Sequence, residues 1–211
     1  VVRAGFLNQG RVCLCGSRVL VESSIYQEFR ERFVEEVENL RIGDPLDETT
    51  ELGSLISEAH LKKVLGYVSL ATDEGGKVIT GGEPCLPSDF EGGNWMAPTV
   101  IENLSPSSRC STEEIFGPVV TLHKFQDEEE AINMANGTRY GLAGSVWTRD
   151  IEKGKRVSES MDTGMVWINT WLHRDLRTPF GGVKDSGVGR EGGRWSLDFF
   201  SEALNICVKH D

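Results

Sequence analysis

Short apolar runs along the chain predict β-strands. The strongest are residues 18–22 (RVLVE), 119–125 and 165–169 (MVWIN), which are rich in β-branched and aromatic side chains. Weaker signals of the same kind lie at 77–80 and 144–148. The runs lack strict alternation with polar residues, so we expect strands that are buried on both faces.

Between the strands, apolar residues recur every three or four positions, as on the buried face of a helix. A first helix is expected from five such positions: Ile25, Phe29, Phe33, Val37 and Leu40. Ser24 is its expected N-cap, with Gln27 as the capping-box partner. Ser57 is expected to open a second helix with this apolar set: Leu61, Val64, Val68 and Ala71.

The second half of the chain continues the alternation. Asp127 is expected to cap a helix whose first turn carries three glutamates, where the helix dipole favours negative charge, and Gly137 ends it. Another helix is expected at 150–161. Strands joined by helices in this way indicate an α/β fold with a mostly parallel sheet covered by helices on both faces.

Two glycine-rich segments do not belong to this pattern. Residues 81–98 are rich in Gly, Pro and Asp and predict a surface loop. Residues 187–192 match the G-x-G-x-x-G pattern, but no apolar strand precedes them, as a dinucleotide-binding fingerprint requires. We therefore expect a turn that leads into a terminal helix at 194–202.

Charge and cysteine content narrow the possible partners. The net charge is −11, from 33 acidic and 22 basic residues, which argues against a nucleic acid or an anionic membrane as partner. No apolar run approaches the ~20 residues of a membrane span. The number of cysteines is odd, 5, and their spacing is irregular. This is not a secreted disulfide framework, and a reducing, cytoplasmic setting is expected.

Cys13 and Cys15 follow an Asn-Gln-Gly turn at Asn8–Gly10. A structural zinc needs four ligands, and the four histidines form no metal-binding pair with usual spacing, so we expect no metal. A free cysteine is most often a small buried hydrophobe. Backbone N–H groups exposed by a glycine turn could instead stabilise a thiolate and then an oxyanion. The residues alone leave packing and nucleophilic roles open.

The segment after the run at 165–169 reads TWLHRDLRTPFGGV and extends from Thr170 to Val183. Ligands bind at the carboxyl ends of strands in sheets of this kind, so the segment is a candidate binding loop. The alternative is a plain surface loop whose arginines pair with Asp175 or a nearby acid.

Four ordered segments resemble one family. Phe6-x-Asn8-Gln9-Gly10-x-x-Cys13-x-x-x-x-Arg18 resembles the active-site cysteine signature of the NAD(P)-dependent aldehyde dehydrogenases. EEIFGPV, YGLAGSVWT and PFGGVKDSGVGREGG follow in the family's order, and together they cover essentially the whole chain. Within the family, WLHRDLRTPFGG most resembles the 2-hydroxymuconic and 2-aminomuconic semialdehyde dehydrogenases.

The resemblance implies covalent catalysis by Cys13, with Cys15 in a packing role. The Cys13 thiolate would attack the aldehyde carbon to form a thiohemiacetal, hydride would pass to NAD or NADP, and water would release the acid from a thioacyl enzyme. Glu114 would hold the nicotinamide ribose and Phe116 the ring beside it. The alternative for this pair is a helix-end carboxylate and a core aromatic.

The resemblance also implies a substrate site. Leu7, Arg174 and Phe180 match positions that line the family's aldehyde tunnel. Many relatives carry an aromatic residue where Arg174 stands, and an arginine suits a substrate with its own carboxylate. Arg177 is a second candidate for that contact. The expected substrate is a small carboxylate-bearing semialdehyde.

The resemblance finally implies the domain organisation. Residues 1–200 would be the catalytic domain and 201–211 an oligomerisation strand of a dimer or tetramer. The family's cofactor domain, general-base glutamate and oxyanion asparagine precede the cysteine, so we expect the catalytic portion of a longer enzyme, inactive by itself. Two alternatives remain: a non-catalytic oligomerisation or binding module, and a dehydrogenase that acylates coenzyme A.

Overall fold

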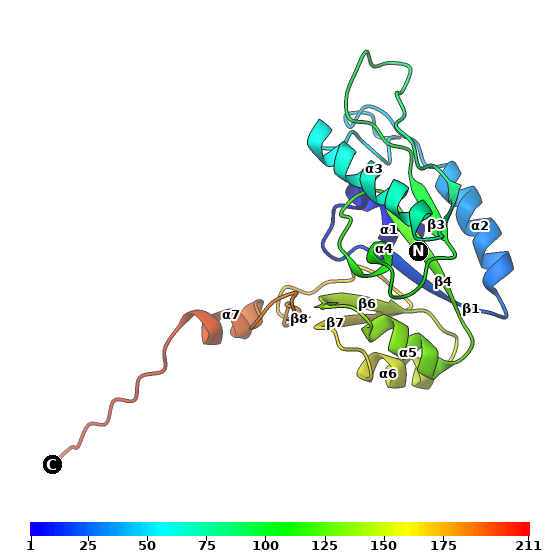
Figure 1. The fold of residues 1–211 in the computed structure, drawn as a ribbon. Helices are drawn as coiled ribbons and strands as arrows, with labels where there is room; N and C mark the ends of the chain where they lie inside the picture. Colours follow the sequence, from blue (N-terminus) through cyan, green and yellow to red (C-terminus); the bar gives the residue numbers. More distant parts are fainter.

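A four-stranded sheet forms the centre of the computed structural model, which describes residues 1–211. Its strand order is β1-β4-β3-β2 (Figure 1). β1 (Arg18–Glu22), β4 (Val119–Phe125) and β3 (Thr99–Glu102) are parallel, and β2 (Lys77–Thr80) pairs antiparallel with β3. This confirms the predicted α/β class. The sequence pattern missed β3, whose four residues directly follow the glycine- and proline-rich loop at 81–98.

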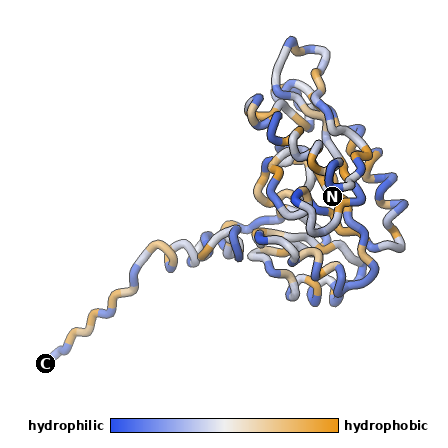
Figure 2. The backbone as a smooth tube through the Cα atoms, viewed as in Figure 1, coloured by the Kyte–Doolittle hydropathy of each residue, from blue (hydrophilic) through white to orange (hydrophobic).

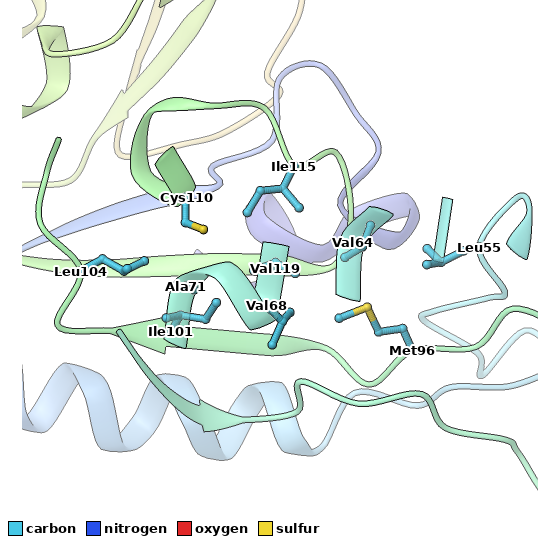
Figure 3. Packing of buried hydrophobic residues seen from close by; sticks show 10 residues of the cluster. All are labelled: Leu55, Val64, Val68, Ala71, Met96, Ile101, Leu104, Cys110, Ile115 and Val119. Atoms are coloured by element: carbon cyan, nitrogen blue, oxygen red, sulfur yellow. The ribbon is translucent and has the colours of Figure 1, made fainter. Parts of the chain in front are cut away.

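Helices cover both faces of this sheet. α3 (Glu58–Asp73) and the short α4 (Arg109–Thr112) lie on one face, while α1 (Val2–Gly10) and α2 (Tyr26–Glu38) lie on the other (Figure 1). The sheet's alternation divides the core accordingly. The cluster under α3 is drawn in Figure 3 and contains Leu55, Val64, Val68, Ala71, Met96, Ile101, Leu104, Cys110, Ile115 and Val119. The opposite cluster includes Phe6, Phe33, Val37, Val100, Val120 and Leu122.

The remaining strands form two small sheets instead of extending the first. β6 (Ala143–Val146) pairs parallel with β7 (Met165–Ile168), and α6 (Ile151–Glu159) packs against both. β5 (Tyr140–Gly141) pairs antiparallel with β8 (Val183–Lys184).

α5 (Glu128–Asn136) lies beside α6 in Figure 1, and its Glu128 pairs with Arg156 of α6. α5 also contacts β1 and β4. The guanidinium of Arg18 in β1 donates to the carbonyls of Met134 and Ala135 at the end of α5, at 2.8 Å each. Because the last carbonyls of a helix have no partner within it, this arginine both caps α5 and joins it to the central sheet.

The structure corrects the predicted start of the first helix. Its N-cap is Ile25, which makes no side-chain cap bond and is 53% exposed. The Ser24 hydroxyl bonds Glu22, and the Gln27 amide donates to Glu31. The chain turns immediately after β1, with the Ile25 N–H bonded to the Glu22 carbonyl, so Ser24 lies inside that turn and cannot cap. The other predicted caps are confirmed at Ser57 and Asp127, and Asp150, the first residue of the helix predicted at 150–161, is the N-cap of α6.

The chain ends in α7 (Gly193–Phe200) and an extended tail that runs away from the body of the molecule (Figure 1). Residues 201–211 form no strand in the single chain, and all are exposed. In Figure 2 the tail shows hydrophobic segments that alternate with hydrophilic ones. Strand pairing with a neighbouring subunit therefore stays a prediction. No helix combines the length and the apolar character needed to cross a bilayer.

The buried His123 predicts a loss of stability in mild acid. It is 4% exposed, and its Nε2 lies 3.0 Å from the Thr121 hydroxyl. Burial, with the nearby charge of Arg18, lowers the pKa of His123 to about 4, and a backbone bond near Leu104 opposes the shift. The unfolded chain takes up this proton near pH 6.5 and the folded chain does not, so stability falls as pH drops through that window.

We expect the free energy of unfolding to fall by on the order of 3 kcal/mol between about pH 6.5 and 4 from this group. Urea unfolding at several pH values measures it. His123→Leu should flatten this part of the profile, and an unchanged slope in that variant would contradict the assignment.

Candidate active site

The turn before Cys13 has an unusual backbone conformation. Helical geometry is lost at Leu7, and Asn8, Gln9 and Gly10 have φ values of 52°, 57° and 68°. This left-handed region is costly for most residues and open to glycine, as expected for Asn-Gln-Gly. With its amide oxygen turned toward Gly53, Gln9 accepts a bond from the Gly53 N–H at 2.6 Å. The turn is therefore held from outside as well as by its own residues.

Cys13 and Cys15 lie in different environments. The Cys15 N–H donates to the Val12 carbonyl at 2.8 Å, which closes a tight turn with Cys13 inside it. Cys13 is exposed. The Cys15 thiol is half-buried and lies 3.9 Å from the Leu7 carbonyl, and burial raises the pKa of that thiol. The packing role fits Cys15, whereas Cys13 is accessible to an electrophile.

The EEIFGPV segment lies directly against the Asn-Gln-Gly turn. A Cβ placed on Gly10 would lie 2.0 Å from the Gly117 carbonyl oxygen, so only a glycine permits this approach of the two backbones. Gly117 is packed in turn against Val64 of α3. Segments more than a hundred residues apart in sequence therefore meet beside Cys13.

Side chains from α3 hold the backbone of the EEIFGPV segment. His60 Nε2 lies 2.9 Å from the Phe116 carbonyl oxygen, and Lys63 Nζ donates to the Glu114 carbonyl at 3.4 Å. Burial, together with the charges of Arg11 and Lys63, lowers the pKa of His60, although its bond to Phe116 opposes this. Phe116 has a φ of 59°, so its backbone conformation needs such support. Sequence reasoning missed this role of α3.

The two glutamates of this segment differ in their partners. Glu113 is the C-cap of α4 and is bonded to Arg109 and Tyr67, and these hydrogen bonds lower the pKa of its carboxyl group. Glu114 is exposed, and its carboxylate makes no hydrogen bond or ion pair within the chain. The alternative role, a carboxylate at a helix end, is therefore filled by Glu113 and not by Glu114. Glu114 keeps an open carboxylate and Phe116 is half-buried, and the predicted role of this pair at a nicotinamide ribose stays a prediction.

The loop after β7 reaches the turn that contains Cys13. The Trp171 indole Nε1 donates to the Leu14 carbonyl at 2.8 Å. Leu14 is 5% exposed and lies next to Cys13 in sequence. This contact brings the predicted binding loop to the predicted nucleophile.

The two arginines of this loop have different partners. The Arg177 Nε donates to Asp175 Oδ1 at 2.9 Å, and this contact lowers the pKa of the Asp175 carboxyl group. The alternative, a surface arginine paired with Asp175, therefore describes Arg177. The Arg174 guanidinium lies 4.6 Å from the centre of the Phe180 ring and makes no hydrogen bond or ion pair within the chain. Arg174 is the better placed of the two for an incoming carboxylate.

A groove of about 480 Å³ runs along this loop. Arg174, Phe180 and Trp167 are among its lining residues, and Cys13 and Leu7 are not. Arg174 and Phe180 therefore line the same groove, whereas Cys13 lies outside it on the adjoining turn. No cluster of three or more His, Cys, Asp or Glu side chains could hold a metal ion.

Residues 1–206 match the aldehyde dehydrogenase family, and the chain belongs to that family. It is 48% identical, over 99% of its length, to 2-aminomuconic semialdehyde dehydrogenase of Mus musculus and 46% identical, also over 99%, to 2-hydroxymuconic semialdehyde dehydrogenase of Pseudomonas putida. It covers 44% and 43% of those two proteins, respectively, and so spans less than half the length of these curated relatives.

Solved structures have the same fold. Betaine aldehyde dehydrogenase of Staphylococcus aureus in complex with NAD⁺ superposes with a TM-score of 0.92 at 40% identity, over 94% of this chain and 39% of that one. HpcC of Thermus thermophilus gives a TM-score of 0.92 at 41% identity, over 99% of this chain and 43% of that one. The family resemblance drawn from the four sequence motifs is confirmed.

Proposed function

We propose that this chain is the catalytic portion of an NAD-dependent aldehyde dehydrogenase with Cys13 as nucleophile. The observation that carries the proposal is the position of Cys13. It is exposed between the Asn8–Gly10 turn, which lies against the EEIFGPV segment, and Leu14, which contacts the loop with Arg174. NAD is favoured over NADP because a similar structure is described in complex with NAD⁺. Residues 1–200 would form the catalytic domain.

Cys13 begins the reaction by attack of its thiolate on the aldehyde carbon, which forms a C–S bond and an oxyanion. The Cys13 backbone N–H makes no hydrogen bond within the chain and can donate to that oxyanion. When bound, oxidised nicotinamide supplies a hydride acceptor, which Glu114 and Phe116 would hold in place. Loss of hydride from the carbon leaves a thioester on Cys13. Attack by water then breaks the C–S bond and releases the carboxylic acid.

Family resemblance assigns the general base for that last step to a segment that precedes the cysteine. We therefore propose that these 211 residues alone do not oxidise aldehydes. The exposed apolar side chains of Leu204, Ile206 and Val208 support pairing of the tail with a second copy in a homo-oligomer. Five free cysteines support a reducing, cytoplasmic setting.

The proposed substrate is a semialdehyde that carries a carboxylate at its other end. Support comes from the free guanidinium of Arg174 and from the similarity of the chain to two semialdehyde dehydrogenases. The fixed fork of N–H donors in arginine matches a carboxylate in a bidentate geometry.

Arg174→Leu is expected to raise KM for a dicarboxylic semialdehyde by about 10- to 100-fold, as for loss of a hydrogen-bonded charge pair. KM for a neutral alkanal of the same length should stay unchanged. Steady-state kinetics of the natural full-length protein, followed by NADH absorbance, measure both. Arg177→Leu is the matched control, with a small effect because it removes an exposed ion pair. Equal effects of Arg174→Leu on the two substrates would refute the assignment.

A further inference from the structure

Two tryptophan indoles anchor the loop that carries Arg174. The Trp171 Nε1 donates to the Leu14 carbonyl, and the Trp167 Nε1 donates to the His173 carbonyl, at 2.8 Å in each case. The first bond attaches the loop to another part of the chain, 157 residues away in sequence. The second bond secures the residue immediately before Arg174. The loop is therefore fixed on the N-terminal side of its free arginine.

The Trp171 bond ends on the turn that presents the nucleophile. Leu14 lies within the turn closed by the Cys15 N–H and the Val12 carbonyl, directly after Cys13. Leu14 is buried, so its carbonyl is part of a packed segment. Any displacement of the Trp171 indole thus changes the position of the loop relative to the Cys13 thiol.

The arginine is also supported from its other side. Its guanidinium stacks on Phe180, whose backbone exchanges two hydrogen bonds of 2.8 Å with Glu191. Stacking leaves the N–H edges of the guanidinium open to a carboxylate. The guanidinium and the turn that carries Cys13 are therefore held by separate contacts. Trp171 connects the loop to that turn, and Trp167 fixes the residue before Arg174.

We infer that Trp171 and Trp167 are positioning residues that set the separation between the Cys13 thiol and the Arg174 guanidinium, and so select the length of the carboxylate-bearing aldehyde. This inference rests on the proposed function. A bound semialdehyde must place its carbonyl carbon at the thiol and its carboxylate at the arginine together. Only a substrate whose length matches that separation gains both contacts.

The test compares dicarboxylic semialdehydes of increasing length with neutral alkanals of the same lengths, in the natural full-length protein. The wild-type protein should prefer one semialdehyde length. Trp171→Phe keeps an aromatic ring and removes the N–H donor. It should lower kcat/KM for the preferred semialdehyde by about threefold to tenfold, the usual effect of one lost hydrogen bond. It should also flatten the length preference and leave kcat/KM for alkanals unchanged.

Trp147→Phe is the matched control, because Trp147 is 52% exposed and its indole makes no hydrogen bond within the chain. Trp167→Phe probes the second anchor independently, should Trp171→Phe fold poorly. A double-mutant cycle adds a stricter criterion. In an Arg174→Leu background, Trp171→Phe should no longer change the ratio of semialdehyde to alkanal activity.

The outcomes separate the inference from the proposed function. A full-length wild-type protein that oxidises no aldehyde would refute the proposed function. Normal oxidation, combined with an equal loss for semialdehydes and alkanals in Trp171→Phe and in Trp167→Phe, would refute the positioning role alone. Additive effects of Trp171→Phe and Arg174→Leu would also refute it, because the indole would then act independently of the arginine.

Discussion

Cys13→Ser is expected to lower kcat for aldehyde oxidation by about 10⁴-fold or more in the natural full-length protein. A serine hydroxyl keeps the shape of the side chain but is a far weaker nucleophile at neutral pH than a thiolate. NADH absorbance measures the loss. Cys15→Ala is the matched control and should retain most of the activity, because the Cys15 thiol is half-buried and bonded to the Leu7 carbonyl. A large loss with Cys15→Ala and none with Cys13→Ser would transfer the nucleophile to Cys15.

Thiol alkylation tests the same assignment on this chain without turnover. Cys13 and Cys207 are both exposed, but only Cys13 lies beside a turn with free backbone N–H groups. Burial raises the pKa of Cys110 to about 12, so that thiol should react last. Iodoacetamide at neutral pH, followed by peptide mass spectrometry, should modify Cys13 faster than Cys207. Equal rates would show that the turn does not activate the thiol.

Gly10→Ala is expected to lower the free energy of unfolding by about 2 to 5 kcal/mol. One part of this cost is the left-handed conformation at φ 68°, about 1–2 kcal/mol for a residue with a Cβ. The other part is overpacking, since the new Cβ would lie 2.0 Å from the Gly117 carbonyl oxygen. The atoms nearest to this Cβ belong to the backbone of Gly117 and Pro118 and cannot rotate away. Urea unfolding measures the change.

Gly66→Ala is the matched control for this experiment. Gly66 lies within α3, and a Cβ there would meet nothing within 4 Å. The substitution should therefore stabilise the chain by about 0.5–1 kcal/mol through helix propensity. Similar stabilities of Gly10→Ala and the wild-type chain would show that the Asn-Gln-Gly turn and the EEIFGPV segment do not meet as described.

Local sequence patterns predicted most helices and strands that have a clear apolar run or a clear capping residue. The predicted strand at 119–125 has the observed bounds of β4, and the cap at Asp127 is bonded to the Glu130 N–H. Errors arose where neighbouring structure overrode propensity. Ser24 is a good N-cap residue, but the turn that leaves β1 places Ile25 at the helix start. β3 is only four residues long and is defined by its pairing with β2 and β4.

The predicted site also has one part that the sequence predicted and another part that only the structure shows. The left-handed turn at Asn8–Gly10 could be assigned from the sequence, because amide and glycine residues in a row are a local signal. The nucleophilic role of Cys13 stays a prediction. The supports of the site, His60 on α3 and Trp171 in the loop, carried no such signal. Their hydrogen-bond partners, Phe116 and Leu14, are distant in sequence.

The amino-acid sequence by itself determined the family, through four ordered motifs, and it determined the turn before Cys13 and the alternation of strands and helices. The turn depends on neighbouring residues, and the alternation of elements depends on periodicity. Only the tertiary structure decided that Arg177 is neutralised by Asp175 while Arg174 stays free, and that an indole connects the loop of Arg174 to the turn of Cys13. The physical reason is that ion pairs and long-range hydrogen bonds depend on the three-dimensional distance between two groups. A pattern of neighbouring residues does not predict that distance.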